Sequence, residues 1–117
     1  MRAAAALALA LVLVATGCGS AARGPTSDSK LGRTLIEHYG CGACHEIGGV
    51  DGATGHVGPP LKHFRDKRRI AGKLPNTRAN AARWVQHPDR IKPQADMPNL
   101  GLTPGEANDI VAYLETQ

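Results

Sequence analysis

The feature that most constrains this chain is the stretch Cys41-Gly42-Ala43-Cys44-His45. Two cysteines separated by two residues and followed directly by a histidine form the haem-attachment pattern, in which both thiols become thioethers and the histidine reaches the iron. The spacing puts both sulfurs on one side of a helical turn, and the small Gly42 and Ala43 leave room for the ring. The sequence therefore predicts one haem c, attached through Cys41 and Cys44 and ligated by His45.

Two other uses of a Cys-x-x-Cys pair need different surroundings. A thioredoxin-like dithiol is expected within a βαβ pattern, and a structural zinc site needs a second ligand pair at regular spacing. The remaining histidines, His38, His56, His63 and His87, form no such pair. Haem is favoured over a colourless exported dithiol oxidoreductase and over zinc.

The size and composition of the chain agree with a bound apolar cofactor. With 117 residues the chain allows one small domain, and fewer than about 100 residues remain once a leader is removed, a size at which burial alone is marginal. Aromatic residues make up only 3% of the chain, which is little for a core. A haem in the middle would supply the missing apolar surface.

The amino terminus predicts export and a lipid anchor. Met1-Arg2 and the apolar run over residues 3–15 are typical of a secretory signal and too short to span a membrane comfortably. Ala15-Thr16-Gly17-Cys18 resembles a bacterial lipobox, in which cleavage precedes a cysteine that then carries lipid; the alternative is an ordinary signal peptide and an unmodified thiol. Lipidation would account for the odd cysteine, because Cys18 would otherwise stay free and oxidisable.

These signals predict three parts of the chain. Residues 1–17 would be a lipoprotein signal peptide, residues 18–29 a lipidated cysteine with a flexible tether rich in Gly, Ser and Pro, and residues 30–117 the folded domain. The mature protein would sit in the cell envelope, lipid-anchored on the extracytoplasmic side of a bacterial membrane without crossing it.

Two helices are predicted at the ends of the folded domain. Asp28 or Ser29 can cap a first helix, which Gly40 ends just before the cysteines. Thr103-Pro104-Gly105-Glu106 is a capping box for a last helix. The apolar positions at helical spacing are Leu31, Leu35, Ile36 and Tyr39 in the first helix and Ala107, Ile110, Val111 and Leu114 in the last.

Less regular structure is predicted between these helices. A glycine-rich loop over residues 46–56 leads to Gly58-Pro59-Pro60-Leu61, and residues 61–70 are expected to form a short helix. Another helix is predicted to begin at Leu74-Pro75-Asn76-Thr77, with Thr77 or Asn76 as its cap, and to end at His87-Pro88. The basic residues Lys62 to Arg69 suggest either a solvated face or an electrostatic docking site for an acidic redox partner.

Any second iron ligand has to come from the rest of the chain. Met97 lies on a proline-bounded loop, and a thioether is a soft ligand that raises the potential and leaves no open coordination position. If Met97 only fills core, then His56, His63 or His87 could ligate, or the sixth position could stay open.

The motifs together resemble class I c-type cytochromes. The family crosses its terminal helices at a small residue flanked by aromatics, which Gly32 and Tyr113 match, although Ile36 stands where an aromatic is common. The resemblance implies a small all-α cytochrome c fold with three to five helices around one haem, and Met97 as the second ligand. It also implies that the Pro59 carbonyl accepts a hydrogen bond from His45.

A narrower resemblance extends from Lys30 to the end of the chain. The residues that carry it are Leu74-Pro75-Asn76-Thr77, Asn80, Trp84, Lys92-Pro93 and Met97-Pro98. They are similar to the cytochrome c domain fused to subunit II of some haem-copper oxidases. In such a domain the Trp84 indole would pack beside the haem and donate to a propionate; a core tryptophan with a backbone partner is the alternative.

The resemblance implies an electron carrier that transforms no substrate. Its partners would be an electron donor and a terminal oxidase or other reductase, with a membrane held through the lipid anchor, no nucleic acid, and a monomeric state. A rival hypothesis is a haem-based gas sensor with an open or weakly held sixth position, which rapid carbon monoxide binding would reveal.

Overall fold

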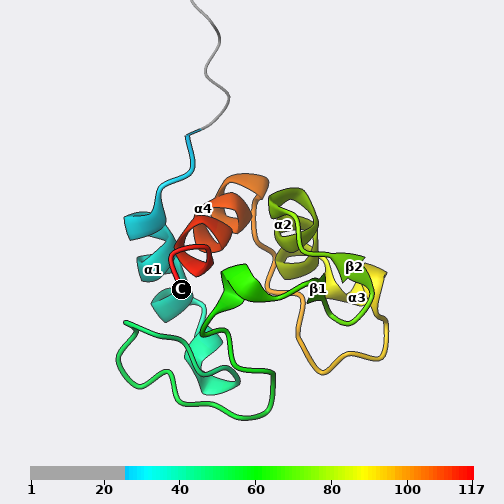
Figure 1. The fold of residues 1–117 in the computed structure, drawn as a ribbon, viewed down its shortest axis with the longest axis horizontal. Coiled ribbons are helices and arrows are strands. Elements are labelled where there is room, and N and C mark those ends of the chain that lie inside the picture. The colour runs from blue at the N-terminus through cyan, green and yellow to red at the C-terminus, as the bar shows by residue number, and fades with distance from the viewer. Residues whose placement is uncertain (1–25) are drawn as a thin grey trace, which may run out of the picture.

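The computed structural model describes residues 26–117, and this part of the chain is largely helical. Its elements are α1 (Ser29–His38), η1 (Cys41–Ala43), η2 (Phe64–Asp66), β1 (Arg69–Ile70), β2 (Leu74–Pro75), α2 (Arg78–Gln86), α3 (Pro88–Ile91) and α4 (Pro104–Leu114), where η marks a short 3-10 helix. Helix α4 contacts α1 on one side and α2 on the other, and β1, β2 and α3 lie on the α2 side (Figure 1). Four α-helices fit the predicted fold, but the two-stranded antiparallel sheet corrects the all-α prediction.

Helix α1 begins and ends where the sequence predicts. The Asp28 side chain accepts hydrogen bonds from the N–H groups of Lys30 and Leu31, and Gly40 adopts the left-handed conformation (φ 69°) just after the helix. Ile36 is buried, whereas Leu31 is 46% exposed. Only part of the predicted apolar face therefore enters the core.

Helix α4 begins with the predicted capping box. The Thr103 hydroxyl accepts from the Glu106 N–H at 3.3 Å, and the Glu106 carboxylate accepts from the Thr103 N–H at 2.8 Å. Its apolar face is buried along the whole helix, at Ala107, Ile110, Val111 and Leu114.

The two terminal helices cross at Gly32. A Cβ atom at this position would lie 1.9 Å from the carbonyl oxygen of Asp109, so only a glycine lets the backbones approach this closely. The Tyr39 hydroxyl donates to Glu106 at 2.9 Å, which joins the end of α1 to the start of α4. The predicted crossing is confirmed, and Ile36 fills it with a side chain that is 1% exposed.

The helix predicted over residues 61–70 is wrong. His63 has a positive φ of 56° and Lys67 is extended, so helical structure is limited to one turn at η2. Ile70 then pairs with Leu74 across a three-residue connection, residues 71–73. The carbonyls of Phe64 and Lys67 are satisfied instead by the amide of Asn76, which donates to them at 2.9 and 2.8 Å, an arrangement that local periodicity does not reveal.

The next helix starts at one of the two predicted caps, Thr77. Leu74–Pro75 is strand β2, and α2 begins at Arg78 with the Thr77 hydroxyl accepting from the Asn80 N–H. The predicted break at His87-Pro88 is present, but the chain turns directly into the short α3.

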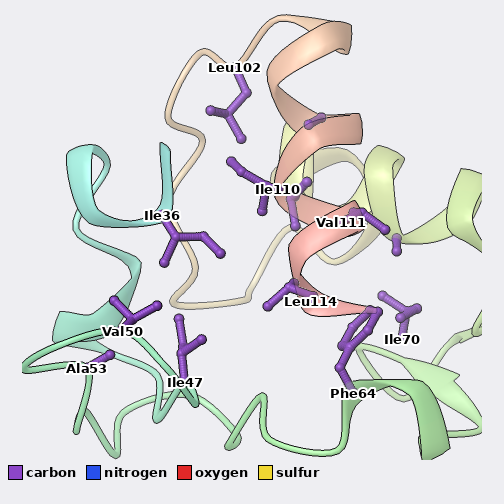
Figure 2. Close-up of a cluster of buried hydrophobic side chains, with 13 residues drawn as sticks. Ile36, Ile47, Val50, Ala53, Phe64, Ile70, Leu102, Ile110, Val111 and Leu114 are labelled. Carbon is purple, nitrogen blue, oxygen red and sulfur yellow. The ribbon is translucent and has the colours of Figure 1, made fainter. Parts of the chain in front are cut away.

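The core lies between α1, α4 and the loops that follow the cysteines. Figure 2 shows side chains from these segments meeting around α4. The buried apolar residues are Ile36, Ile47, Val50, Ala53, Phe64, Ile70, Ala81, Val85, Leu102, Ala107, Ile110, Val111, Ala112 and Leu114.

The predicted leader and anchor lie outside the described residues, which begin at Thr26. From there to the end of the chain no helix has the length and apolar character needed to cross a membrane. Ser27 and Asp28, which the sequence assigns to the tether, contact the folded part, since Asp28 N–H donates to Asp109 at 2.7 Å and Ser27 bonds to Arg78.

Candidate cofactor site

The cysteine motif forms one tight turn directly after α1. Gly40 reverses the chain, η1 covers Cys41–Ala43, and the N–H groups of Cys44 and His45 both donate to the Cys41 carbonyl, at 3.2 and 3.0 Å. Both cysteines are half-buried free thiols. The turn therefore presents Cys41, Cys44 and His45 from one short rigid segment.

An apolar pocket opens beside this turn. It is lined by Ile36, Cys41, His45, Ile47, Leu61, Val85, Met97, Leu100, Leu102, Ile110 and Leu114. His45, Met97 and Cys41 are the members of this lining that carry a nitrogen or sulfur in the side chain. The pocket thus joins two candidate iron ligands, 52 residues apart in the sequence, with one of the attachment thiols.

The orientation of His45 is fixed by main-chain groups. Its Nδ1 lies 2.7 Å from the Pro59 carbonyl oxygen. Because a carbonyl can only accept, Nδ1 carries the proton and donates, which leaves the lone pair of Nε2 free for a metal. The Gly58 N–H donates to the Cys44 carbonyl at 2.8 Å, so the Pro59 segment is tied to the motif that it supports.

Gly58 also packs flat against the imidazole. A Cβ atom at this position would lie 2.3 Å from His45 Cε1 and 2.7 Å from Nδ1. The sequence analysis named Gly58 only as part of the Gly58-Pro59-Pro60-Leu61 stretch. It did not predict that Gly58 holds the imidazole ring. A glycine directly before the proline is the signal that could have indicated a close approach.

Met97 reaches the pocket from the segment after α3. Its side chain is half-buried, while its neighbours Asp96 and Pro98 are exposed. His56 and His63, two of the alternative ligands, are exposed and do not line the pocket. His87 is half-buried with its Nδ1 lacking a hydrogen-bond partner among the described residues, and it also lies outside the lining.

Trp84 lies next to the core but not in the pocket lining. It is half-buried on α2 and packs against the buried cluster, one residue before the pocket residue Val85. Among the described residues its indole makes no hydrogen bond to a backbone carbonyl. The suggested bond to a propionate stays a prediction.

The donor set and the pocket fit a covalently attached haem. Apolar walls surround an imidazole whose orientation is fixed and a thioether, which is the ligand pair of low-spin electron-carrying haem proteins. Burial raises the pKa of the Cys41 thiol, whereas a redox dithiol depends on a lowered pKa. Over residues 26–117 no three His, Cys, Asp or Glu side chains gather as a metal site of the zinc type.

Long-range hydrogen bonds hold the glycine-rich loop against the helices. The Tyr113 hydroxyl donates to the Gly48 carbonyl at 2.8 Å, and Arg33 Nε donates to the Gly49 carbonyl at 2.7 Å. The Gly55 N–H donates to the Gly42 carbonyl within the motif. Sequence reasoning missed these supports of the site, since no local pattern indicates contacts between such distant residues.

Comparison with known proteins points in the same direction. A family model described as Cytochrome c matches residues 29–117. The chain is 28% identical over 91 residues to cytochrome c oxidase subunit 2 of Bacillus subtilis strain 168, and 30% identical over 83 residues to the subunit of the same name from Bacillus sp. strain PS3. These matches cover 74% and 68% of this chain but only 26% and 23% of the relatives, so the chain spans about a quarter of their length.

Proposed function

Because this chain belongs to the cytochrome c family, we propose that it is a single-electron carrier holding one haem c through Cys41 and Cys44, with His45 and Met97 as the residues that would ligate its iron. The observation that carries the proposal is the shared apolar pocket, which His45 and Met97 both line beside Cys41. When bound, the haem supplies an iron that changes its charge by one electron.

The residues around the pocket have separate tasks in this proposal. The Pro59 carbonyl, 2.7 Å from Nδ1, holds the His45 ring and increases the electron density on Nε2. The soft thioether of Met97 would favour the ferrous state of a bound haem iron and would occupy the position where a small molecule could bind. The aliphatic walls exclude water, which keeps the surroundings of the iron nearly unchanged during transfer.

Two further parts of the proposal concern where the protein works. The signal sequence over residues 1–17 would direct export, and lipid on Cys18 would hold the domain at the outer face of a bacterial membrane. The names of the two relatives support a terminal oxidase as the electron acceptor. We expect a monomer that meets its donor and acceptor through transient contacts.

Visible spectroscopy on the full chain, produced in a host that exports it and attaches haem c, tests the ligand assignment. The wild type should show a low-spin spectrum with the far-red ferric band of methionine ligation, and Met97→Ala should lose that band. Leu100→Ala is the matched control, because Leu100 lines the same pocket but carries no ligand atom. A high-spin wild-type spectrum that Met97→Ala leaves unchanged, with rapid carbon monoxide binding, would favour a gas sensor instead.

The anchor has its own test. Intact-mass measurement of the wild type from the membrane fraction should show a diacylated or triacylated Cys18, and Cys18→Ser should release holoprotein into the soluble fraction. Wild-type protein that is cleaved elsewhere and carries no acyl chain would refute the anchor without touching the haem assignment.

A further inference from the structure

Met97 is carried by the connection between α3 and α4, called here the Met97 segment, residues 92–103 (Figure 1). This segment contains no helix or strand, and three of its side chains, Met97, Leu100 and Leu102, line the pocket. Eight of its twelve residues are exposed, namely Lys92, Pro93, Gln94, Asp96, Pro98, Asn99, Gly101 and Thr103. Irregular and exposed segments open at low free energy, so the position of Met97 depends on the contacts that hold this one.

Backbone hydrogen bonds hold only the two ends of the Met97 segment. The Lys92 N–H donates to the Pro88 carbonyl at 2.8 Å and the Ala95 N–H to the Lys92 carbonyl at 2.9 Å, while the Thr103 carbonyl accepts from the first turn of α4. Over residues 96–100, no backbone N–H or carbonyl has a hydrogen-bond partner within the described part of the chain. Met97 thus lies in the stretch that the backbone does not fix.

The side chain of Asn99 supplies the support that this stretch lacks. Its Nδ2 donates to Asp89 Oδ1 at 3.0 Å, and its Oδ1 accepts from the Gly101 N–H at 3.0 Å. Because a carboxylate only accepts and a backbone N–H only donates, both bonds require the amide in this one orientation. The first bond ties the segment to α3, and the second shapes the turn in which Gly101 has a φ of 70°.

The partner of Asn99 belongs to a fixed part of the fold. Asp89 is the second residue of α3, and Pro88 directly before it is among the most completely buried side chains of the described residues. Beyond Asn99, the Gln86 amide on α2 donates to the Leu102 carbonyl at 3.0 Å. The segment is therefore attached to α3 just after its candidate ligand and to α2 further on.

We infer that Asn99 and Asp89 are positioning residues that hold the Met97 thioether in the pocket, an inference that rests on the proposed electron-carrier function. The Asn99–Asp89 bond is the one hydrogen bond that joins residues 96–100 to a helix of the described chain. Without it, the segment leaves the pocket more often. Opening would free the position that Met97 occupies, so the apparent affinity of an added ligand for the iron rises in proportion to the open fraction.

Imidazole titration of the ferric holoprotein, followed through the far-red band of methionine ligation, tests this inference. Asn99→Ala and Asp89→Ala should each raise the imidazole affinity about fivefold, the effect of losing one exposed hydrogen bond to a charged acceptor. The double variant should bind no more tightly than either single variant, because both substitutions remove the same bond. Asp89→Asn keeps an acceptor oxygen and should stay within about twofold of the wild type.

Two neighbouring side chains provide matched controls. Gln94→Ala removes an exposed amide from the same segment, and Asp96→Ala removes a carboxylate directly beside Met97. Neither side chain makes a hydrogen bond or ion pair among residues 26–117, so each substitution should change the imidazole affinity less than about twofold. In a Met97→Ala background, where no thioether is left to position, Asn99→Ala should have no effect on imidazole binding.

The outcomes separate this inference from the proposed function. A wild type that holds haem but lacks the far-red band would contradict the Met97 ligand itself. With the band present, Asn99→Ala and Asp89→Ala that bind imidazole no more tightly than the two controls would overturn the positioning role and leave the carrier intact. So would multiplying effects in the double variant, or an Asp89→Asn variant that behaves like Asp89→Ala, since neither result fits a single shared hydrogen bond.

Discussion

Replacing Gly32 by alanine should destabilise the domain although alanine is the better helix former. The added Cβ would lie 1.9 Å from the Asp109 carbonyl oxygen, and ordinary contact begins near 3.4 Å, so α1 and α4 would have to separate by about 1.5 Å. The gain in helix propensity is about 1 kcal/mol, whereas forcing extra volume into a packed contact costs about 1–3 kcal/mol or more.

The crossing resists such a movement at several points. Separation would stretch the Tyr39–Glu106 hydrogen bond of 2.9 Å and loosen Ile36, which is 1% exposed. We therefore expect a net loss of about 2 kcal/mol in the free energy of unfolding, equal to a fall in Tm of about 8–16 °C for a domain of this size.

Gly105→Ala in α4 provides the control for this measurement. Its Cβ would meet no atom closer than 4.0 Å, so the same substitution should raise stability by about 0.5 kcal/mol. Guanidinium and thermal unfolding of the two holoproteins, followed by circular dichroism, would compare them directly. A Gly32→Ala variant as stable as wild type would refute the packing argument.

Three further substitutions test other features. Gly58→Ala places a Cβ 2.3 Å from His45 Cε1, so it should displace the ring, shift the visible spectrum and lower the yield of holoprotein. Ala71→Asn should raise Tm by about 4–8 °C, because Ala71 has a φ of 52° in a turn where asparagine is favoured and the strain of the left-handed conformation is about 1 kcal/mol. Hydrogen bonds from the Thr103 N–H, and then from its hydroxyl, hold the pKa of the Glu106 carboxyl below its usual 4.5. The free energy of unfolding should therefore fall as the pH drops below about 4.5, and Glu106→Gln should make this pH dependence less steep.

The sign for Glu106 follows from proton binding. Between the lowered folded pKa and the unfolded value the unfolded chain binds more protons, so acid favours unfolding there and the contribution is complete above that range. Urea unfolding from pH 3 to 7 measures this contribution, and an equally steep profile in Glu106→Gln would contradict the assignment.

Ala79→Asn, at an exposed site on α2, is the control for Ala71→Asn and should not raise the Tm of the domain.

Local signals predicted the parts of the fold that depend on neighbours in sequence. The Asp28 cap, the Gly40 stop and the Thr103–Glu106 capping box each need only three or four adjacent residues, and α1 and α4 begin where these signals lie. The crossing at Gly32 was predicted from the resemblance to class I c-type cytochromes, which cross their terminal helices at a small residue.

The segment after Leu61 could not be predicted in this way. Leu61 and Phe64 are three residues apart, as on one face of a helix, yet Asn76, nine residues beyond Lys67, takes over two carbonyl acceptors and keeps the chain extended. The pocket was hidden for the same reason, since its walls come from α1, η1, α2, α4 and the two segments that join η1 to η2 and α3 to α4. The sequence suggested both His45 and Met97 as ligands, but only the fold shows that the two side chains line the same pocket.

The support given to His45 by Pro59 has an evolutionary consequence. The acceptor is a main-chain carbonyl, 2.7 Å from Nδ1, and every amino acid has one. A substitution at position 59 leaves this acceptor in place; the hydrogen bond is lost only when His45 itself is replaced or when the backbone is moved, for instance by adding bulk at Gly58. The side chain at position 59 can therefore vary while the acceptor stays, and the geometry of the imidazole is inherited with the backbone.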